Sequence, residues 1–214
     1  MLKIIAGEKS GFELKSPENI RPILARIKKS VFDIIRARIS QSIFLDLFAG
    51  SGSVGLEALS RGAKSVVFVE KEKRCISVLY ENINFLQYRE KSFVINADVL
   101  KDLFWIDKVR KYLTKSDTTG FDIIFVGAPY VGKVTNYKFG IKDLEHKFYN
   151  FKSKDKVLLN LCSPTVKLIY NSEIMKKDGI MIVQRSIKEN LDFYKYKCIR
   201  TEKYGDTIVD FLSY

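Results

Sequence analysis

The sequence predicts an α/β protein whose mostly parallel sheet has helices on both faces and ends in an antiparallel hairpin. From residue 42 to residue 126, short apolar strand-like runs alternate with segments of helical periodicity. Such alternation is typical of βαβ units with right-handed crossovers. A glycine-rich turn joins the first long strand to its helix. Two β-like runs on either side of Tyr204-Gly205-Asp206 predict the terminal hairpin.

Each element is predicted from its own local pattern. β-like runs around Gly7 and Gly11 predict a short hairpin at the start of the chain. Pro22 suits the first turn of a helix, and apolar residues recur at helical spacing from Ile23 to Ile35. Strands are then expected at 42–48, 65–70, 92–97 and 121–126, and helices at 52–60, 72–86 and 99–113. Loops with two helices are expected within 131–178, followed by strands at 179–184, 194–203 and 207–214.

The size and composition of the chain limit its class. Its 214 residues suffice for one α/β domain (41–214) with an N-terminal extension (1–40) that we expect to contact RNA. No apolar run reaches about 18 residues, so no membrane-spanning helix or membrane partner is expected. Three dispersed cysteines fit a reducing cytoplasm. The chain has a single histidine, His146, which argues against a histidine-based zinc site or Ser-His-Asp catalysis. We predict a cytoplasmic monomer without a metal site.

Positive charge lies in two segments that flank a nearly neutral middle. The formal net charge is +12, with +5 in residues 1–40, +1 in 41–130 and +8 in 131–203. A basic surface attracts a polyanion through counterion release, so RNA or DNA is the predicted partner, and general solubility is the alternative explanation. The candidate phosphate contacts are Arg21, Arg26, Lys28 and Lys29.

The turn after the first long strand has the composition of a nucleotide-binding loop. Gly50, Gly52 and Gly55 satisfy the pattern G-x-G-x-x-G between a strand and a helix. Glycines in this setting let backbone N–H groups approach a ligand at the helix N-terminus. Glu70 ends the next strand, 20 residues after Gly50, where a carboxylate can hold ribose hydroxyls. These features fit either NAD(P) or S-adenosylmethionine.

Two further acidic residues help to decide between NAD(P) and S-adenosylmethionine. Asp46 lies four residues before Gly50, where its charge would repel a pyrophosphate but not a sulfonium with a free amino-acid end. Asp98 follows the third strand, where an acid can bind an adenine amino group. The acids at successive strand ends favour a cationic, adenosine-bearing ligand, although they could merely cap helices. An NAD(P)-dependent oxidoreductase is further disfavoured because no acid–base His or Tyr-x-x-x-Lys pair is evident.

The segment from Asp46 to Ala63, DLFAGSGSVGLEALSRGA, closely resembles the cofactor segment of the bacterial small-subunit ribosomal RNA guanine-N2 methyltransferases (RsmD-like). The resemblance extends to residues 4–7, to Arg21-Pro22 and to the tail motif at 204–207. It implies a class I methyltransferase fold, S-adenosylmethionine as donor and methylation of a guanine amine in small-subunit ribosomal RNA. The cofactor residues that it implies are Asp46, Phe48, Ala49, Gly50, Ser51, Gly52, Gly55, Glu70, Lys71, Asp98 and Val99.

One motif departs from the family pattern. Where the family has Asp/Asn-Pro-Pro-Tyr/Phe after the fourth strand, this chain has Gly127-Ala128-Pro129-Tyr130, the candidate catalytic residues. In the family motif, a side-chain oxygen and a backbone carbonyl accept the two amine hydrogens while the aromatic ring stacks on the base.

Gly127 provides no side-chain acceptor, and several hypotheses stay open. Another residue could supply the acceptor, activity could be weak, or the chain could be an RNA-binding homologue that has lost methyl transfer. The four residues could also be only a turn after a buried strand. The family's usual Glu at the end of the fifth strand is replaced here by Gln184.

Overall fold

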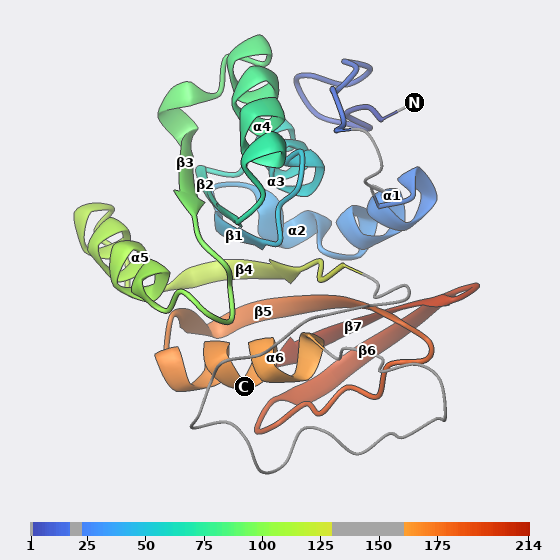
Figure 1. Cartoon of the computed structure of the whole chain (residues 1–214). Helices are drawn as coiled ribbons and strands as arrows, with labels where there is room; N and C mark the ends of the chain where they lie inside the picture. Colours follow the sequence, from blue (N-terminus) through green and yellow to red (C-terminus); the bar gives the residue numbers. More distant parts are fainter. Residues whose placement is uncertain (1, 18–22, 130–160) are drawn as a thin grey trace.

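The computed structural model, which describes residues 2–17, 23–129 and 161–214, contains a seven-stranded sheet (Figure 1). The strands are β1 (Ile43–Leu47), β2 (Ser65–Glu70), β3 (Ser92–Asn96), β4 (Phe121–Val126), β5 (Met175–Ser186), β6 (Lys197–Tyr204) and β7 (Thr207–Ser213). Their order is β3-β2-β1-β4-β5-β7-β6; β1 to β5 pair in parallel, and β7 is antiparallel to both β5 and β6. This confirms the predicted fold class. The order reverses between β1 and β4, and ligands bind at the carboxyl ends of strands beside such a reversal.

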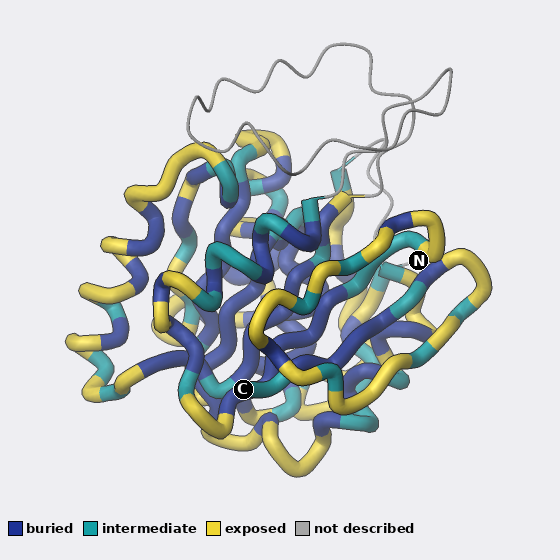
Figure 2. The backbone as a smooth tube through the Cα atoms, turned by 90° about the horizontal axis from the view of Figure 1, so that it is seen from below, coloured by how far each residue is buried: buried dark blue, intermediate teal, exposed yellow. Residues whose placement is uncertain are grey.

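Helices cover both faces of the sheet. They are α1 (Ala25–Ile34), α2 (Arg36–Ile39), α3 (Ser53–Ser60), α4 (Lys73–Phe85), α5 (Phe104–Lys115) and α6 (Cys162–Ser172). One apolar cluster joins residues of α1 to α4 to one face, and a second joins residues of α5 and α6 to the other. Buried residues, dark blue in Figure 2, follow the central strands, whereas exposed residues lie on the outer turns, on the outward sides of the helices and along β6.

Two predicted boundaries differ from the structure by four residues or more. Helix α5 begins at Phe104 rather than at residue 99, because the segment after β3 first forms a turn in which the Asp102 carboxylate accepts the Asp98 N–H at 2.8 Å. Strand β5 begins at Met175 rather than at residue 179, because Met175 pairs with Phe121 across a register shift. One of the two helices expected within 131–178 is α6; His146 lies outside the described residues.

The N-terminal segment packs on the same core as the sheet. Lys3 and Glu13 form an antiparallel bridge, and the Glu8 N–H donates to the Ser60 carbonyl at 2.8 Å. Ile4 and Leu14 belong to the apolar cluster that also contains α1 and α3 residues. The division of the chain at residue 40 stays a prediction. Within the described ranges, no helix is long and apolar enough to cross a membrane.

Candidate active site

The turn between β1 and α3 has a left-handed backbone at its glycines. Gly50 and Gly52 adopt φ values of 56° and 80°, a region that disfavours side chains with a Cβ. A Cβ on Gly50 would meet no atom of the described residues within 4 Å, so this backbone faces open space. A Cβ on Gly52 would lie only 2.3 Å from Leu79 Cδ1 of α4. Gly50 therefore offers bare backbone to a ligand, whereas Gly52 allows the turn to pack closely.

The neighbouring predicted residues fix this turn to the strands and helices around it. Phe48 also has a positive φ, 60°, and the Ala49 N–H donates to the Val69 carbonyl at 3.2 Å. Ser51 is buried, and its carbonyl accepts an N–H from the Asn82 amide at 3.0 Å. The turn is thus anchored to both β2 and α4.

Glu70, at the end of β2, connects the turn to the next strand. Its Oε2 accepts the Gly50 N–H at 2.8 Å, and its Oε1 accepts those of Lys71 and Glu72 at 2.8 and 2.9 Å. The side chain is buried. A carboxylate has about four acceptor positions, and the described residues occupy three of those on Glu70, which leaves one for a ligand hydroxyl.

Asp46, in β1, lies beneath the turn. It is 2% exposed, and its Oδ2 accepts the Gly55 N–H of α3 at 2.9 Å. Burial, together with the nearby Glu70 charge, raises the pKa of Asp46 to about 8, although the Gly55 hydrogen bond opposes the shift. A positive ligand beside Asp46 would favour its ionised form.

Asp98 lies at the carboxyl side of β3, with Lys71 opposite it. Its Oδ2 is 3.2 Å from Lys71 Nζ, and its Oδ1 accepts the Leu100 N–H at 3.1 Å. Val99 is buried, and its carbonyl accepts the indole N–H of Trp105 at 2.9 Å. All three predicted acids thus accept backbone N–H groups, but only Asp46 accepts one from a helix, the Gly55 N–H in the first turn of α3. The N–H groups bound by Glu70 and Asp98 precede α4 and α5, so these two acids do not cap those helices.

The structure brings Asp46, Gly50 and Glu70 together around one turn. Within the part of the chain that the structure describes, no ion pair involves either Asp46 or Glu70. Two buried carboxylates without a cation, beside a backbone that faces open space, form an acidic site. The chemistry of this site fits a cationic, hydroxyl-bearing ligand such as S-adenosylmethionine.

The Gly127 segment follows β4 beside the end of β1. The Gly127 N–H donates to the Leu47 carbonyl at 3.3 Å, which extends the pairing of these strands. A Cβ on Gly127 would lie 2.9 Å from Cε1 of the Phe125 ring. Ala128 is buried and Pro129 exposed; Tyr130 lies outside the described residues. The roles of all four residues stay predictions.

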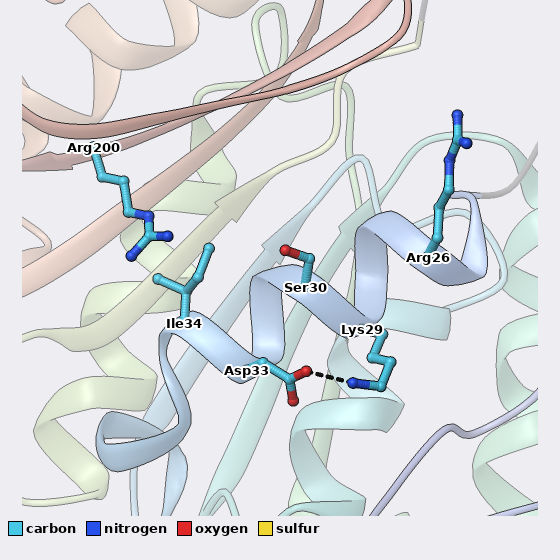
Figure 3. Close-up of a pocket in the computed structure, with 6 residues that line it drawn as sticks. All are labelled: Arg26, Lys29, Ser30, Asp33, Ile34 and Arg200. Atoms are coloured by element: carbon cyan, nitrogen blue, oxygen red, sulfur yellow. Dashed lines mark hydrogen bonds and ion pairs between the residues drawn. The ribbon is translucent and has the colours of Figure 1, made fainter.

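A basic hollow of about 640 Å³ separates α1 from β6 (Figure 3). It is lined by Arg26, Lys29, Ser30, Asp33, Ile34 and Arg200. The hydroxyls of Ser30 and Tyr204 form a hydrogen bond that ties α1 to the end of β6. The predicted contacts Arg26 and Lys29 are thus joined by Arg200. Sequence patterns could not have selected Arg200, because it reaches this hollow through the pairing of the C-terminal hairpin; Arg21 lies outside the described residues.

The prediction that Lys28 contacts RNA needs correction. Its side chain is 1% exposed, and its Nζ lies 3.0 Å from the Glu57 carboxylate, which is 0% exposed. Lys28 also donates to the Lys3 carbonyl at 2.8 Å. Burial lowers the pKa of Lys28, and Glu57 opposes that shift. Lys28 therefore connects α1 to α3 and has no surface to present to a phosphate.

Comparison with known protein families shows to which family the chain belongs. The family described as Conserved hypothetical protein 95, the RsmD family, matches residues 2–149. The chain belongs to this family. The match includes the glycine turn and the Gly127 segment, and it confirms the resemblance found in the sequence.

Relatives and solved structures extend the likeness. The Ribosomal RNA small subunit methyltransferase D of Haemophilus influenzae is 36% identical over 132 residues, which cover 60% of this chain and 64% of that protein. "Uncharacterized methylase RP545" of Rickettsia prowazekii is 27% identical over 100% of this chain and 98% of its own length. The structure of a hypothetical protein from Thermus thermophilus matches over 100% of both chains, with a TM-score of 0.72 and 22% identity.

More distant structures share the fold alone. Two methyltransferases in complex with S-adenosyl-L-homocysteine match with TM-scores of 0.54 at 14% and 10% identity. These neighbours confirm the predicted class I methyltransferase fold.

Proposed function

We propose that this chain is an S-adenosylmethionine-dependent methyltransferase that methylates the exocyclic N2 amine of a guanine in small-subunit ribosomal RNA. The observation that carries the proposal is the acidic site at the β1–α3 turn, where Asp46 and Glu70 lie beside the open backbone of Gly50. Membership of the RsmD family supports it. Because ribosomal RNA is the substrate, we place the monomeric enzyme in the cytoplasm.

The residues of the turn would hold the donor. Glu70 would accept a ribose hydroxyl, Asp98 would accept from the adenine amine, and Asp46 would offset the positive charge. When bound, S-adenosylmethionine would supply the methyl group for the guanine N2, the electron pair of its S–methyl bond would stay on sulfur, and the surplus proton on N2 would pass to water.

The hollow between α1 and β6 would contact the RNA backbone. Arg26, Lys29 and Arg200 place three cations around it, against one lining carboxylate, Asp33. Lys29 pairs with Asp33 at 2.6 Å, and Arg200 pairs with Glu202 at 2.7 Å. Asp33 also pairs with Arg36 at 3.2 Å. Among the described residues, Arg26 is thus the lining cation that forms no ion pair with a carboxylate. Arginine is well suited to bind phosphate because its guanidinium makes two parallel hydrogen bonds.

The base would lie at the Gly127 segment. The backbone carbonyls there can accept one amine hydrogen, and Tyr130 would stack on the ring, a contact worth about 1–3 kcal/mol. Gly127 itself favours a second candidate function, an RNA-binding homologue with weakened or absent methyl transfer. It lacks the side-chain acceptor that would orient the nitrogen.

A methyl-transfer assay separates these functions. Radiolabelled S-adenosylmethionine is incubated with small ribosomal subunits from cells that lack the family enzyme, and the RNA is digested to nucleosides. We expect label in N2-methylguanosine. Label in another nucleoside would overturn the guanine assignment. No label above the enzyme-free control, from protein that binds the donor in calorimetry, would favour the second function.

A further inference from the structure

The strand next to the Gly127 segment places Gln184 directly beside it. In the β4–β5 pair, Val126 is opposite Val183. The Gly127 N–H continues the ladder by donating to the Leu47 carbonyl of β1 at 3.3 Å. The residue next to Gly127 on β5 is therefore Gln184, which still lies within that strand.

Gly127 and Gln184 belong to the same face of the sheet. Side chains alternate between faces along a strand. Phe125 and Ile182 both pack in the cluster that contains α1 and α3, so Gly127 and Gln184, two residues further on, also face that side. The short distance from a Cβ on Gly127 to the Phe125 ring agrees with this placement.

Gly127 and Gln184 also lie where this face of the sheet becomes accessible to solvent. Phe125 is 3% and Ile182 0% exposed, whereas Gly127 and Gln184 are both partly exposed. The backbone of Gln184 is fixed, because β5 lies between β4 and β7 and pairs Gln184 with Val209. The side chain therefore starts from a rigid position at the edge of the proposed base site.

We propose that the side-chain amide of Gln184 supplies the hydrogen-bond acceptor that Gly127 lacks. Adjacent strands are about 4.8 Å apart, and glutamine is one methylene longer than the Asn or Asp of the family motif. With no side chain at position 127, the Gln184 oxygen can approach the space that the motif's oxygen would fill. It accepts one N–H of the guanine amine while a backbone carbonyl of the Gly127 segment accepts the other. This inference rests on the proposed function.

The test compares Gln184→Met with Gln184→Glu. Methionine keeps the length of the side chain but removes the acceptor, whereas glutamate keeps an oxygen acceptor. Removing one preorganised hydrogen-bonding group costs about 10²–10³ in kcat. We expect this loss in Gln184→Met and a rate within about tenfold of wild type in Gln184→Glu. The dissociation constants for S-adenosylmethionine and for small subunits should stay unchanged in both variants.

Second-site rescue completes the test. Any side chain at position 127 must displace the Phe125 ring, which a Cβ there would approach to 2.9 Å. Gly127→Asn in the Gln184→Met background should therefore recover part of the lost rate, and more than Gly127→Ala, which adds the same Cβ without an acceptor. Wild-type kcat in Gln184→Met would overturn the inference, as would equal losses in Gln184→Met and Gln184→Glu or equal outcomes for the two rescue variants. An inactive wild-type enzyme would overturn the proposed function and, with it, this role.

Discussion

The two halves of the proposed active site are built differently. On the donor side, one strand–turn–helix unit and the end of the next strand supply Asp46, Gly50 and Glu70, all within 25 consecutive residues. On the acceptor side, the Gly127 segment, Gln184 and the basic hollow come from α1, β4, β5 and β6. A site made by one local unit leaves a motif in the sequence. In a site whose residues come from several paired strands, a neighbouring strand can supply a functional group in place of the original one. The local sequence motif is then no longer kept.

The ion pair that joins the two sides should show the largest effect. Glu57 of α3 accepts the Ile5 and Ala6 N–H groups at 2.7 and 3.0 Å and pairs with Lys28 of α1, the helix that carries the hollow. Glu57→Gln leaves the Lys28 charge buried without its counter-ion. We expect the free energy of unfolding, measured in urea, to fall by about 3–5 kcal/mol.

A surface pair provides the control. Asp33 is 32% exposed and pairs with Lys29, which is 62% exposed. Asp33→Asn should lower the free energy of unfolding by less than about 1 kcal/mol. Equal losses for Asp33→Asn and Glu57→Gln would show that the buried pair is not what joins the two sides.

On the donor side, the pH dependence of cofactor binding reports on Asp46. Its pKa is raised to about 8, so the unliganded site holds a proton at neutral pH that a cationic ligand must displace. The affinity for S-adenosylmethionine should therefore rise with pH, by up to about tenfold per unit between roughly pH 6 and 8. Calorimetric titrations at four pH values would measure it.

Asp46→Asn should remove this dependence, and Asp107→Asn, an exposed carboxylate on α5, should preserve it. The ligand's own titration affects all three proteins equally, so the ratio of affinities isolates Asp46. The contribution of Asp46 to the free energy of unfolding changes with pH in the opposite direction to the affinity. Between about pH 4 and 8 the folded state keeps a proton that the unfolded state has lost, so Asp46 lowers stability as pH rises. Parallel profiles for Asp46→Asn and wild type would contradict the assignment.

On the acceptor side, single charges in the hollow should have the smallest effects. Arg26→Ala and Arg200→Ala should each weaken small-subunit binding a few-fold and reduce the slope of log affinity against log salt by about 1. Lys111→Ala, an exposed cation on α5, is the matched control and should leave the slope unchanged. An equal change in all three variants would indicate general charge attraction rather than a defined RNA contact.

The elements that sequence predicted well are those with local signals. The bounds of β2 and β4 agree with prediction because uninterrupted runs of Val, Ile and Phe end at Glu70 and at Gly127. The start of α5 was predicted wrongly because the turn after β3 depends on an Asp102 side chain bonded to backbone. The donor-side residues were proposed from the glycine turn, from the acids at successive strand ends and from the family resemblance of residues 46–63.

The errors and gaps on the acceptor side have a non-local origin. Lys28 looked like a surface cation because its partner, Glu57, comes from another helix. Arg200 and Gln184 were not selected because their neighbours are set by the pairing of β5, β6 and β7. Periodicity predicts which face of an element is buried, but it does not predict which residues from distant elements meet.

Calorimetric titration of the wild-type protein with S-adenosylmethionine tests the central claim most directly. Two buried carboxylates beside an open glycine backbone should bind this donor at one site per chain, and a parallel titration with NADH should give no heat of binding. Binding of NADH without binding of S-adenosylmethionine would contradict the account.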